Sequence, residues 1–368
     1  MAIGDLLHQT PVTTPDPYTG CPVTRLTPPD HTSHHMYFYN RMVTSDSSRL
    51  LYCAEINGRR NLYLMELATG DAVQLTEGDA LDDYGAMISA DDKSVYYQQD
   101  RKVWKLDLAT LQRTCLYAAP DGWDCGNWGM SDDNRYLVMT ETRRDTLPDL
   151  TGKKGWEFFP LTCAAKPLCH IVYLDTQTGE HHIVVEDRCW FGHAQLRPGD
   201  PDTILFCHEG PYDMIDARLW LIQSDGSRYR CARPQPKDVI ITHEFWMPTG
   251  DRLAYVYRKA DDGSTETIRM MRPETLEEEL FMPCLPYAHF ICDRQRRWFV
   301  GDCQGQETPI HLQTGEGRGQ EVRNDFIYLV DIARKKEIPL CYHGTSWTTI
   351  HGTCLLYTSP SPRDKRQS

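Results

Sequence analysis

The sequence predicts an all-β fold of the β-propeller type, and three observations support this prediction. A turn signature recurs along the chain, an alternating apolar strand recurs beside it, and both return at roughly the period of a blade built from four short antiparallel strands. The 368 residues exceed the usual domain length, but all-β propellers do so as single units. We therefore expect one domain over residues 1–353.

The first recurring signature is an acidic or glycine-containing turn that leads into a β-rich run. Asp, Asn and Gly favour tight turns, whereas Val, Tyr, Leu and Phe next to them favour strands. The copies are SDSSRLLYCAE from Ser45, ADDKSVYYQ from Ala90, SDDNRYLVM from Ser131, PGDPDTILFC from Pro198, TGDRLAYVY from Thr249 and, more weakly, DRQRRWFVGD from Asp293.

The second signature is an alternating apolar strand that ends in a turn. Alternation is typical of strands whose two faces meet different surroundings. The copies are NLYLMELATG from Asn61, KVWKLDLATL from Lys102, HIVYLDTQTG from His170, RLWLIQSDG from Arg218, the poorer IRMMRPETL from Ile268, and FIYLVDIARKK from Phe326.

The spacing of the turn acids predicts the number of blades. The intervals from Asp46 through Asp91, Asp132, Asp200 and Asp251 to Asp293 are 45, 41, 68, 51 and 42 residues. They indicate six blades, with an insertion in the third at residues 143–167. Because a propeller closes its ring and so leaves no raw strand edges, we expect a seven-bladed propeller whose last blade, after His343, is largely missing from this chain.

The segment from Cys354 to Ser368 does not fit the repeat. It reads CLLYTSPSPRDKRQS and resembles a translated read-through of a sequencing adaptor. We therefore expect residues 354–368 to be a non-native tail, outside the predicted fold.

Composition and charge exclude several classes of function. The net charge of −13 argues against non-specific nucleic-acid binding, which needs a positive surface. The N-terminal segment lacks the features of a secretory signal, and no apolar run of about 18 residues could span a membrane. The fourteen cysteines include no CxxC pair and are expected to be reduced. We expect a cytoplasmic protein with no membrane or nucleic-acid partner.

Three histidines occupy one register in consecutive blades. His193 lies seven residues before Asp200, His243 lies eight before Asp251, and His289 takes the corresponding place in the next blade. Each falls in the innermost strand, at the mouth of the central channel. A single histidine in a strand is usually structural, whereas converging imidazoles are what a metal site or a general base requires.

A polar segment follows the strand after His193. It reads CHEGPYDMIDARLWLI from Cys207 and contains His208, Glu209 and Arg218. Arg218 opens an apolar strand, where it is either an ordinary strand-end charge or a bidentate partner for a carboxylate.

The first blade adds His31, His34 and His35. Their spacing in PDHTSHHMYFYN also fits metal ligands, but a solvated loop or a packed strand entry explains it better. We assign a role to none of them.

The sequence resembles the oligogalacturonate lyase family from Val23 to about Trp347. The motifs that carry the resemblance are VTRLTPPD, YFYNRMVTSD, FCHEGPYDMIDARLW, THEFWMP and HGTSW. The resemblance implies a seven-bladed propeller that cleaves short galacturonate oligomers such as digalacturonate by metal-assisted β-elimination, with Mn²⁺ as the divalent metal. The product would be a 4,5-unsaturated uronate.

The resemblance also implies roles for individual residues. His243 corresponds to the catalytic base, Arg218 to a catalytic arginine and His289 to a metal ligand. The remaining ligands, a Gln followed by a His-x-His pair, are expected just beyond Trp347, and His351 does not reproduce them. We add His193, His208 and Glu209, which lie near these positions in the repeat, as candidate substrate-binding residues.

Two other functions compete with the lyase. A non-catalytic propeller that serves as an interaction or ligand-binding module would explain the repeats but not the histidines in register. The propeller half of a serine peptidase is disfavoured because the sequence has no GxSxG motif.

Overall fold

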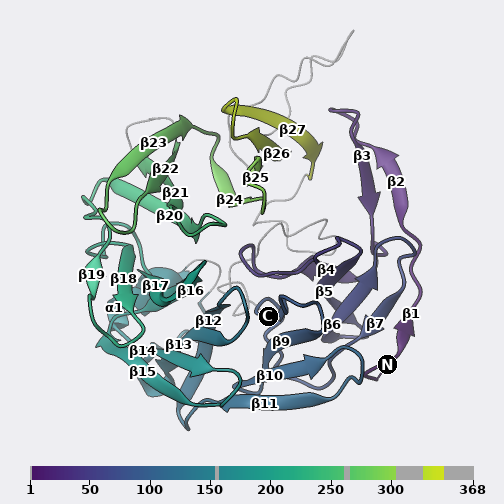
Figure 1. Ribbon diagram of the computed structural model, residues 1–368, viewed down its shortest axis with the longest axis horizontal. Coiled ribbons are helices and arrows are strands. Elements are labelled where there is room, and N and C mark those ends of the chain that lie inside the picture. Colours follow the sequence, from purple (N-terminus) through teal and green to yellow (C-terminus); the bar gives the residue numbers. More distant parts are fainter. Residues whose placement is uncertain (1, 154–156, 261–265, 304–325, 344–368) are drawn as a thin grey trace. The chain divides into compact units, whose positions relative to one another are not determined.

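The computed structural model describes residues 2–153, 157–260, 266–303 and 326–343 (Figure 1). These residues form two compact units. Of the described residues, the first contains 2–96, 106–112, 284–303 and 326–343, and the second contains 97–105, 113–153, 157–260 and 266–283. Almost all regular structure in both units is antiparallel β-strand.

The first unit contains two multi-stranded sheets and a hairpin. One sheet has the order β1-β7-β6-β5-β4 and consists of β1 (Leu6–Leu7), β4 (Thr32–His35), β5 (Arg49–Ile56), β6 (Arg59–Glu66) and β7 (Ala72–Gln74). The other runs in chain order through β24 (Tyr287–Cys292), β25 (Trp298–Cys303), β26 (Phe326–Asp331) and β27 (Lys336–Tyr342). The hairpin pairs β2 (Val12–Pro15) with β3 (Pro22–Arg25).

The second unit contains three four-stranded sheets, each in chain order. They consist of β12 (Trp123–Met130), β13 (Tyr136–Arg143), β14 (Leu168–Asp175) and β15 (His181–Arg188); of β16 (Phe191–Arg197), β17 (Asp200–His208), β18 (Leu219–Gln223) and β19 (Arg230–Cys231); and of β20 (Val239–Trp246), β21 (Leu253–Lys259), β22 (Thr267–Met271) and β23 (Glu278–Pro283). The predicted insertion lies between β13 and β14 and holds the 3₁₀ helix η1 (Arg144–Thr146) and the helix α1 (Phe158–Ala165).

A sixth sheet has the order β11-β10-β9-β8. Its strands are β8 (Met87–Ile88), β9 (Ser94–Gln99), β10 (Lys102–Asp107) and β11 (Arg113–Ala118). The described residues thus contain six sheets of four or five strands, which is the number that the turn spacing predicts. The predicted seventh blade is not among them, and its expected residues after His343 lie outside the described ranges.

The recurring turns are closed by one hydrogen-bond pattern. The carboxylate of Asp46 accepts from the hydroxyl of Thr44 at 2.7 Å and from the backbone N–H of Ser48 at 3.0 Å. Asp91 accepts in the same way from Ser89 and Lys93, and Asp133 from Ser131 and Arg135. In the third copy, therefore, Asp133 closes the turn rather than Asp132, which the sequence analysis counted. Asp132 instead accepts from the backbone N–H of Gly199 at 2.8 Å, in the turn between β16 and β17.

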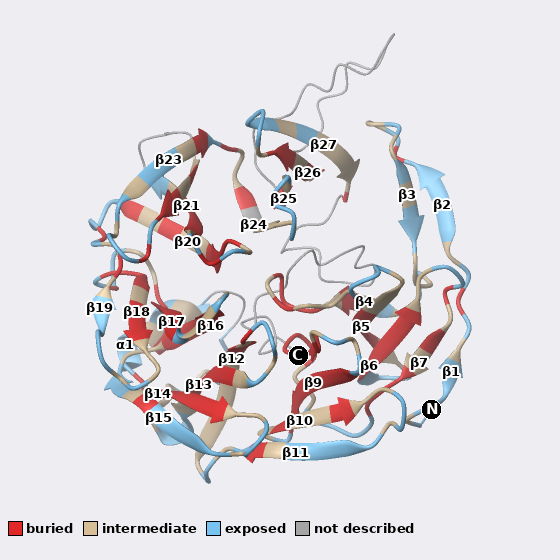
Figure 2. Cartoon of the chain, viewed as in Figure 1, coloured by how far each residue is buried: buried red, intermediate tan, exposed pale blue. Residues whose placement is uncertain are grey.

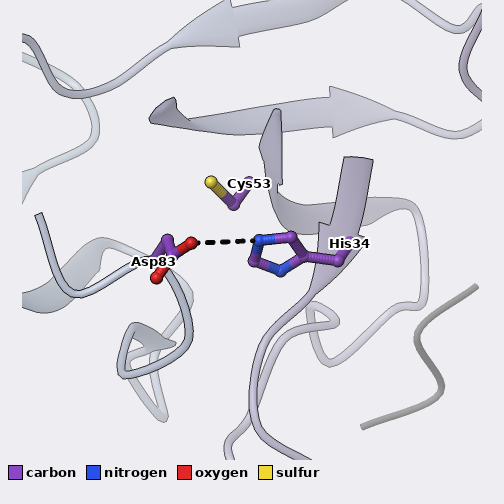
Figure 3. Close-up of side chains that lie close together, drawn as sticks. All are labelled: His34, Cys53 and Asp83. Carbon is purple, nitrogen blue, oxygen red and sulfur yellow. Dashed lines mark ion pairs between the residues drawn. The ribbon is translucent and has the colours of Figure 1, made fainter. Parts of the chain in front are cut away.

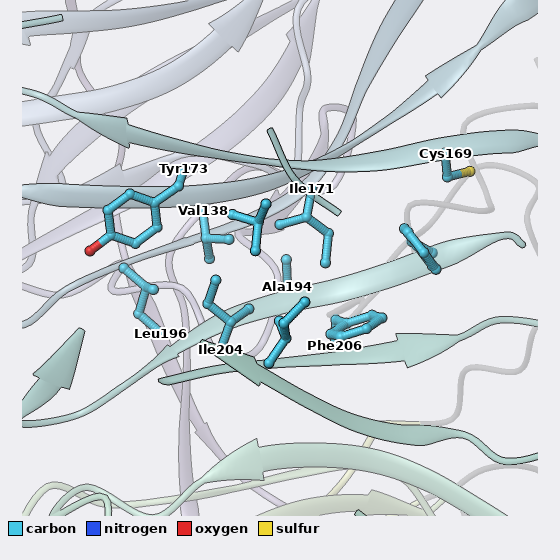
Figure 4. Close-up of a cluster of buried hydrophobic side chains, with 11 residues drawn as sticks. Val138, Cys169, Ile171, Tyr173, Ala194, Leu196, Ile204 and Phe206 are labelled. Atoms are coloured by element: carbon cyan, nitrogen blue, oxygen red, sulfur yellow. The ribbon is translucent and has the colours of Figure 1, made fainter. Parts of the chain in front are cut away.

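The apolar faces of neighbouring sheets in the second unit pack directly against each other. Figure 4 shows Val138 and Ile171 from the β12–β15 sheet beside Ala194, Ile204 and Phe206 from the β16–β19 sheet. All five are fully buried. Figure 2 shows how the inner and outer strands differ in burial: β16 is buried, whereas the outer strand β15 is largely exposed. Packing of this kind fixes the relative position of the first strands, which carry the candidate site.

Two further observations bear on the sequence predictions. Neither of the described helices is long and apolar enough to cross a membrane. The thirteen described cysteines are all free thiols.

Candidate active site

The three histidines in register lie on the first strands of their sheets, as predicted. His193 is on β16 and His243 on β20 in the second unit, and His289 is on β24 in the first. In each of these strands the pairing register shifts at the histidine, between Gly192 and Gln195, between Thr242 and Phe245, and between Tyr287 and His289. A β-bulge of this kind bends the strand and re-aims the side chains beside it.

Two of these histidines adopt a left-handed backbone conformation. The φ angle is 51° at His193 and 58° at His243. A non-glycine residue in this region inside a strand is uncommon and costs on the order of 1–2 kcal/mol. Such conformations concentrate at functional sites, where the surrounding structure holds them in place. The equivalent bulges therefore mark His193 and His243 as candidates for function.

Arg218 is the centre of a buried ionic network in the second unit. It directly precedes β18, and its side chain reaches Glu244 on β20. Its Nε donates to Glu244 Oε2 at 2.7 Å and its Nη2 to Glu244 Oε1 at 3.0 Å, which makes a bidentate pair. Its Nη1 approaches Glu209 Oε2 at 3.4 Å. Arg218 is 5% exposed and Glu244 is fully buried, so this pair is shielded from water.

His193 joins the same network from β16. Its Nδ1 lies 2.7 Å from Glu244 Oε1, and its Nε2 lies 3.5 Å from Glu209 Oε1. Because carboxylates only accept hydrogen bonds, Nδ1 donates to Glu244, and the 3.2 Å separation between Nδ1 and Arg218 Nη2 is a contact rather than a hydrogen bond. His193 thus helps to hold both carboxylates that face Arg218.

The charges of the network stabilise one another. Burial alone lowers the pKa of Arg218, but Cys207, Glu244 and Glu209 outweigh it and raise that pKa well above its usual range. Burial alone raises the pKa of Glu244, yet Arg218 and His193 hold it well below its usual range. Glu244 therefore stays a carboxylate and Arg218 a guanidinium in the fold. Removing one partner would leave an uncompensated buried charge, at a cost of about 3–5 kcal/mol.

Gly192 makes room for Glu209. A Cβ at Gly192 would lie 2.7 Å from the side chain of Glu209 and 3.1 Å from the sulfur of Cys207. That sulfur in turn approaches Glu209 Oε1 at 3.4 Å. A glycine is needed here because the carboxylate packs directly against the backbone of β16.

His208 occupies an aromatic stack at the end of β17. Its ring stacks on Trp220 with the centroids 4.4 Å apart and on Phe191 at 5.5 Å. Its Nε2 lies 3.2 Å from the hydroxyl of Tyr229. Burial lowers the pKa of His208 to about 4, so the ring is neutral at physiological pH.

The structure brings four of the predicted residues to neighbouring places and adds one. His193, Glu209 and Arg218 meet in the ionic network, and His243 lies half-buried on β20 directly before the network residue Glu244. The sequence analysis missed Glu244. The only signal that could have found it is the charged residue inside the apolar run THEFWM, which must be paired if buried.

His289 lies in a different setting, in the first unit. It is buried, its backbone N–H donates to Asp302 Oδ1 at 2.7 Å, and its ring contacts the rings of Tyr37 and Phe38. His35 lies on β4 of the same unit. Its Nδ1 is 2.5 Å from the carbonyl oxygen of Met36, which is an ordinary local contact. His351 and the positions beyond Trp347, where further metal ligands are expected, lie outside the described residues.

The antiparallel sheets that follow one another along the chain define a β-propeller. A buried arginine–glutamate network lies where the β16–β19 sheet meets β20 and forms a polar site there. The sequence profile described as oligogalacturonate lyase matches residues 1–366. The chain therefore belongs to the oligogalacturonate lyase family.

Individual relatives agree with this assignment. The chain is 35% identical over 365 residues to an oligogalacturonide lyase of Pectobacterium atrosepticum, covering 98% of this chain and 92% of that protein. It is 36% identical over 367 residues to an oligogalacturonate lyase of Dickeya dadantii, with the same coverage. A solved structure described as oligogalacturonate lyase in complex with manganese superimposes with a TM-score of 0.86 at 35% identity, covering 99% of this chain and 93% of that chain.

These similarities confirm the predicted all-β propeller and the predicted family of lyases. They favour an enzyme over the non-catalytic binding module, because the curated relatives are named as lyases and match 98% of this chain.

Proposed function

We propose that this protein cleaves short galacturonate oligomers by β-elimination, with His243 as the base and Arg218 as a catalytic arginine. The observation that carries the assignment is the strained bulge of β20. It sets His243, at a φ of 58°, directly before Glu244, which holds the guanidinium of Arg218 in a bidentate pair. The names of the relatives supply the substrate class, oligogalacturonides.

The reaction removes a proton next to a carboxylate. Half-buried His243 takes the C5 proton of the uronate with its imidazole nitrogen. The electron pair of that C–H bond forms the C4–C5 double bond. The C4–O bond breaks with its electron pair on the leaving oxygen, which takes up a proton from solvent, so the shortened oligosaccharide leaves as a saturated product and an unsaturated uronate is the second product. No water is consumed. The fixed positive charge of Arg218 stabilises the negative charge that develops as the proton leaves.

We propose that His289 contributes one ligand to a divalent metal, most simply Mn²⁺. A buried imidazole at the start of β24 fits such an ion, because neutral imidazole nitrogen is a common ligand for first-row divalent metals. The solved relative in complex with manganese supports the choice of metal. When bound, the ion would supply a Lewis acid that offsets the charge of the substrate carboxylate.

The proposed substrate-binding roles of His193, His208 and Glu209 stay predictions. Their surroundings favour a supporting function: His193 and Glu209 flank Arg218, and His208 is neutral within an aromatic stack. We propose that they position the arginine and the wall of the site beside it.

We also propose a seventh blade and a cytoplasmic location. One face of the β24–β27 sheet carries the apolar cross-strand row Ile291, Val300, Leu329 and Ile338, in which Val300 is 40% and Ile338 37% exposed. The β2–β3 hairpin reaches the same sheet, because Asp16 accepts from the backbone N–H of Tyr342 at 2.8 Å. A further sheet that includes this hairpin would cover the row within the single domain predicted over residues 1–353. Free thiols throughout the described chain support a reducing compartment.

The test is product formation from digalacturonate by the purified protein with Mn²⁺. We expect one unsaturated uronate and one saturated galacturonate per cleavage, identified by mass spectrometry and by the ultraviolet absorbance of the new double bond. Two saturated products, of which one carries solvent oxygen when the reaction runs in heavy-oxygen water, would instead identify hydrolysis. Absence of turnover together with saturable binding of digalacturonate would favour the binding module.

A further inference from the structure

A second cluster of metal-ligating residues lies in the first unit and uses none of the residues proposed above. His34 on β4 faces Cys53 across the strand pair β4–β5, and Asp83 approaches from the segment between β7 and β8 (Figure 3). All three are buried. Their candidate ligand atoms lie within 4.8 Å of one another.

The geometry of this cluster is close to that of a coordination shell. Zinc-to-ligand distances of about 2.0–2.3 Å in a tetrahedron separate neighbouring ligand atoms by roughly 3.5 Å. His34 Nε2 already lies 3.4 Å from Asp83 Oδ2. Cys53 Sγ, from the strand paired with β4, lies within 4.8 Å of both atoms, so metal binding would draw the sulfur inward to complete the shell.

The imidazole of His34 is oriented as a ligand. Its Nδ1 lies 3.1 Å from the carbonyl oxygen of His35, and because a carbonyl can only accept, Nδ1 carries a proton. Metal-ligating histidines typically donate their second ring N–H to a backbone carbonyl in this way. Nε2 is therefore the nitrogen that faces Asp83, with its lone pair directed toward the cluster.

A competing arrangement needs no metal. Arg60 Nη1 donates to Asp83 Oδ2 at 3.0 Å, while its Nε donates to Glu55 at 3.0 Å, and the ring of Tyr84 covers His34 at 4.1 Å. Arg60 alone could balance the charge of Asp83 as an ion pair. The Arg60 side chain is 41% exposed, so it can move toward Glu55 or remain as a hydrogen-bond donor to a ligating carboxylate.

We propose that His34, Cys53 and Asp83 bind a divalent ion of the zinc class. One thiolate, one imidazole and one carboxylate form a ligand set that suits Zn²⁺, and the soft thiolate disfavours Mg²⁺, Ca²⁺ and Mn²⁺. Binding forms three coordinate bonds and releases the thiol proton of Cys53 to solvent. The bound ion ties β4 and β5 to the segment that leads into β8.

The test uses Co²⁺ as a spectroscopic substitute for zinc in the purified full chain. We expect a near-ultraviolet thiolate-to-cobalt charge-transfer band and visible bands of tetrahedral intensity. Cys53→Ser should abolish the charge-transfer band, and Asp83→Asn should weaken binding by about tenfold or more. His289→Ala should leave the band intact, which separates this site from the proposed manganese site and makes the two proposals fail independently.

Two measurements guard against misfolded variants and against the wrong thiol. In the wild-type chain, Zn²⁺ should protect one cysteine from alkylation, and peptide mass spectrometry should identify it as Cys53. Arg60→Ala, which removes the competing cation, should tighten Co²⁺ binding. Protection of Cys207, which forms the other buried cluster with His193 and Glu209, or a charge-transfer band that survives Cys53→Ser, would overturn the assignment. So would the absence of any thiolate-to-metal band in wild type.

Discussion

The left-handed conformation of His243 is the residue-scale feature from which the proposed chemistry follows. A strand would normally place residues 242, 243 and 244 on alternating faces, but the bulge breaks this alternation. Glu244 is thereby committed to the buried network while His243 remains half-buried. A base must reach a substrate proton, which a fully buried imidazole cannot do.

We expect His243→Asn to reduce kcat by roughly 10²–10⁴-fold, because a general base contributes this much to proton abstraction. Asparagine tolerates the left-handed φ of 58° better than alanine, so the fold should be retained. Steady-state kinetics on digalacturonate and far-ultraviolet circular dichroism provide the two readouts. Turnover within a few-fold of wild type would remove His243 as the base.

Arg218→Lys tests whether the planar guanidinium is required. A lysine ammonium cannot span both oxygens of Glu244 and also reach Glu209. We expect kcat to fall at least tenfold although the charge is retained, with a smaller change in KM. Arg135→Lys is the matched control, since Arg135 pairs with Asp175 at an exposed site. Near-wild-type kinetics for Arg218→Lys would mean that Arg218 is only a strand-end residue.

His208 makes stability depend on pH. Burial lowers its folded-state pKa to about 4, below the value of about 6.5 in the unfolded chain. The unfolded state therefore binds the proton more tightly, and the stability due to neutral His208 is lost as pH falls from about 6.5 toward 4. We expect this loss to reach about 2 kcal/mol between pH 7 and pH 5.

The measurement is urea unfolding of wild type and His208→Phe at both pH values. Phenylalanine keeps the stack on Phe191 and Trp220 but cannot titrate. The stability difference between the two proteins should therefore shift in favour of the variant at pH 5. An unchanged difference would show that His208 is not responsible.

At the scale of the element, the repeated turns show what the sequence could predict. The Ser/Thr-x-Asp pattern is local, because a hydroxyl and a carboxylate two residues apart close the turn on themselves, and so it can be found by inspection. In SDDN this pattern selects Asp133, because Met130 rather than a hydroxyl residue lies two positions before Asp132. Counting the first aspartate of the turn instead gave Asp132, which accepts from the backbone N–H of Gly199 in the next sheet, a contact that no local pattern shows.

We expect Asp133→Ala to destabilise the fold by about 1–2 kcal/mol. The change removes the acceptor for the Ser131 hydroxyl and for the Arg135 backbone N–H. Asp121→Ala is the matched control, because Asp121 is fully exposed and its ion pair with Arg101 is 4.0 Å long. Denaturant unfolding followed by fluorescence measures both. Equal effects of the two substitutions would argue against the turn pattern as a source of stability.

The candidate site was predictable only in part, for a reason that also lies at this scale. The position of a residue along a strand can be found by counting back from the turn that follows the strand. This counting placed His193, His243 and His289 on the first strands of their sheets. Pairing between strands of different sheets does not follow from counting. Glu244 meets Arg218 only because two sheets dock face to face, and no local pattern in THEFW encodes that contact.

At the scale of the whole molecule, the proposed manganese site gives a prediction about metal removal. We expect dialysis against a chelator to abolish turnover and added Mn²⁺ to restore it, because the substrate carboxylate otherwise opposes proton loss. His289→Ala should not recover at the same Mn²⁺ concentration. Full activity after removal of all metal, checked by elemental analysis, would exclude a metal-dependent reaction.

The number of blades marks the limit of prediction at this scale. The turn spacing gave six, and six sheets are present in the described ranges. The seventh was inferred from ring closure and from family resemblance, and the apolar row ending at Ile338 is the physical reason to keep it as a proposal.

The network around Arg218 also has a consequence for how the protein folds. Its charged groups Glu209, Arg218 and Glu244 and the imidazole of His193 come from β16, from the segment between β17 and β18, and from β20, so no single sheet can complete it. Before those sheets dock, each group remains hydrated. A half-docked intermediate would leave unpaired ions in an interface from which water is excluded. The arrangement therefore acts as a check on folding: partly assembled chains are penalised and inactive, and catalytic competence arises in the same step as the final closure of the core.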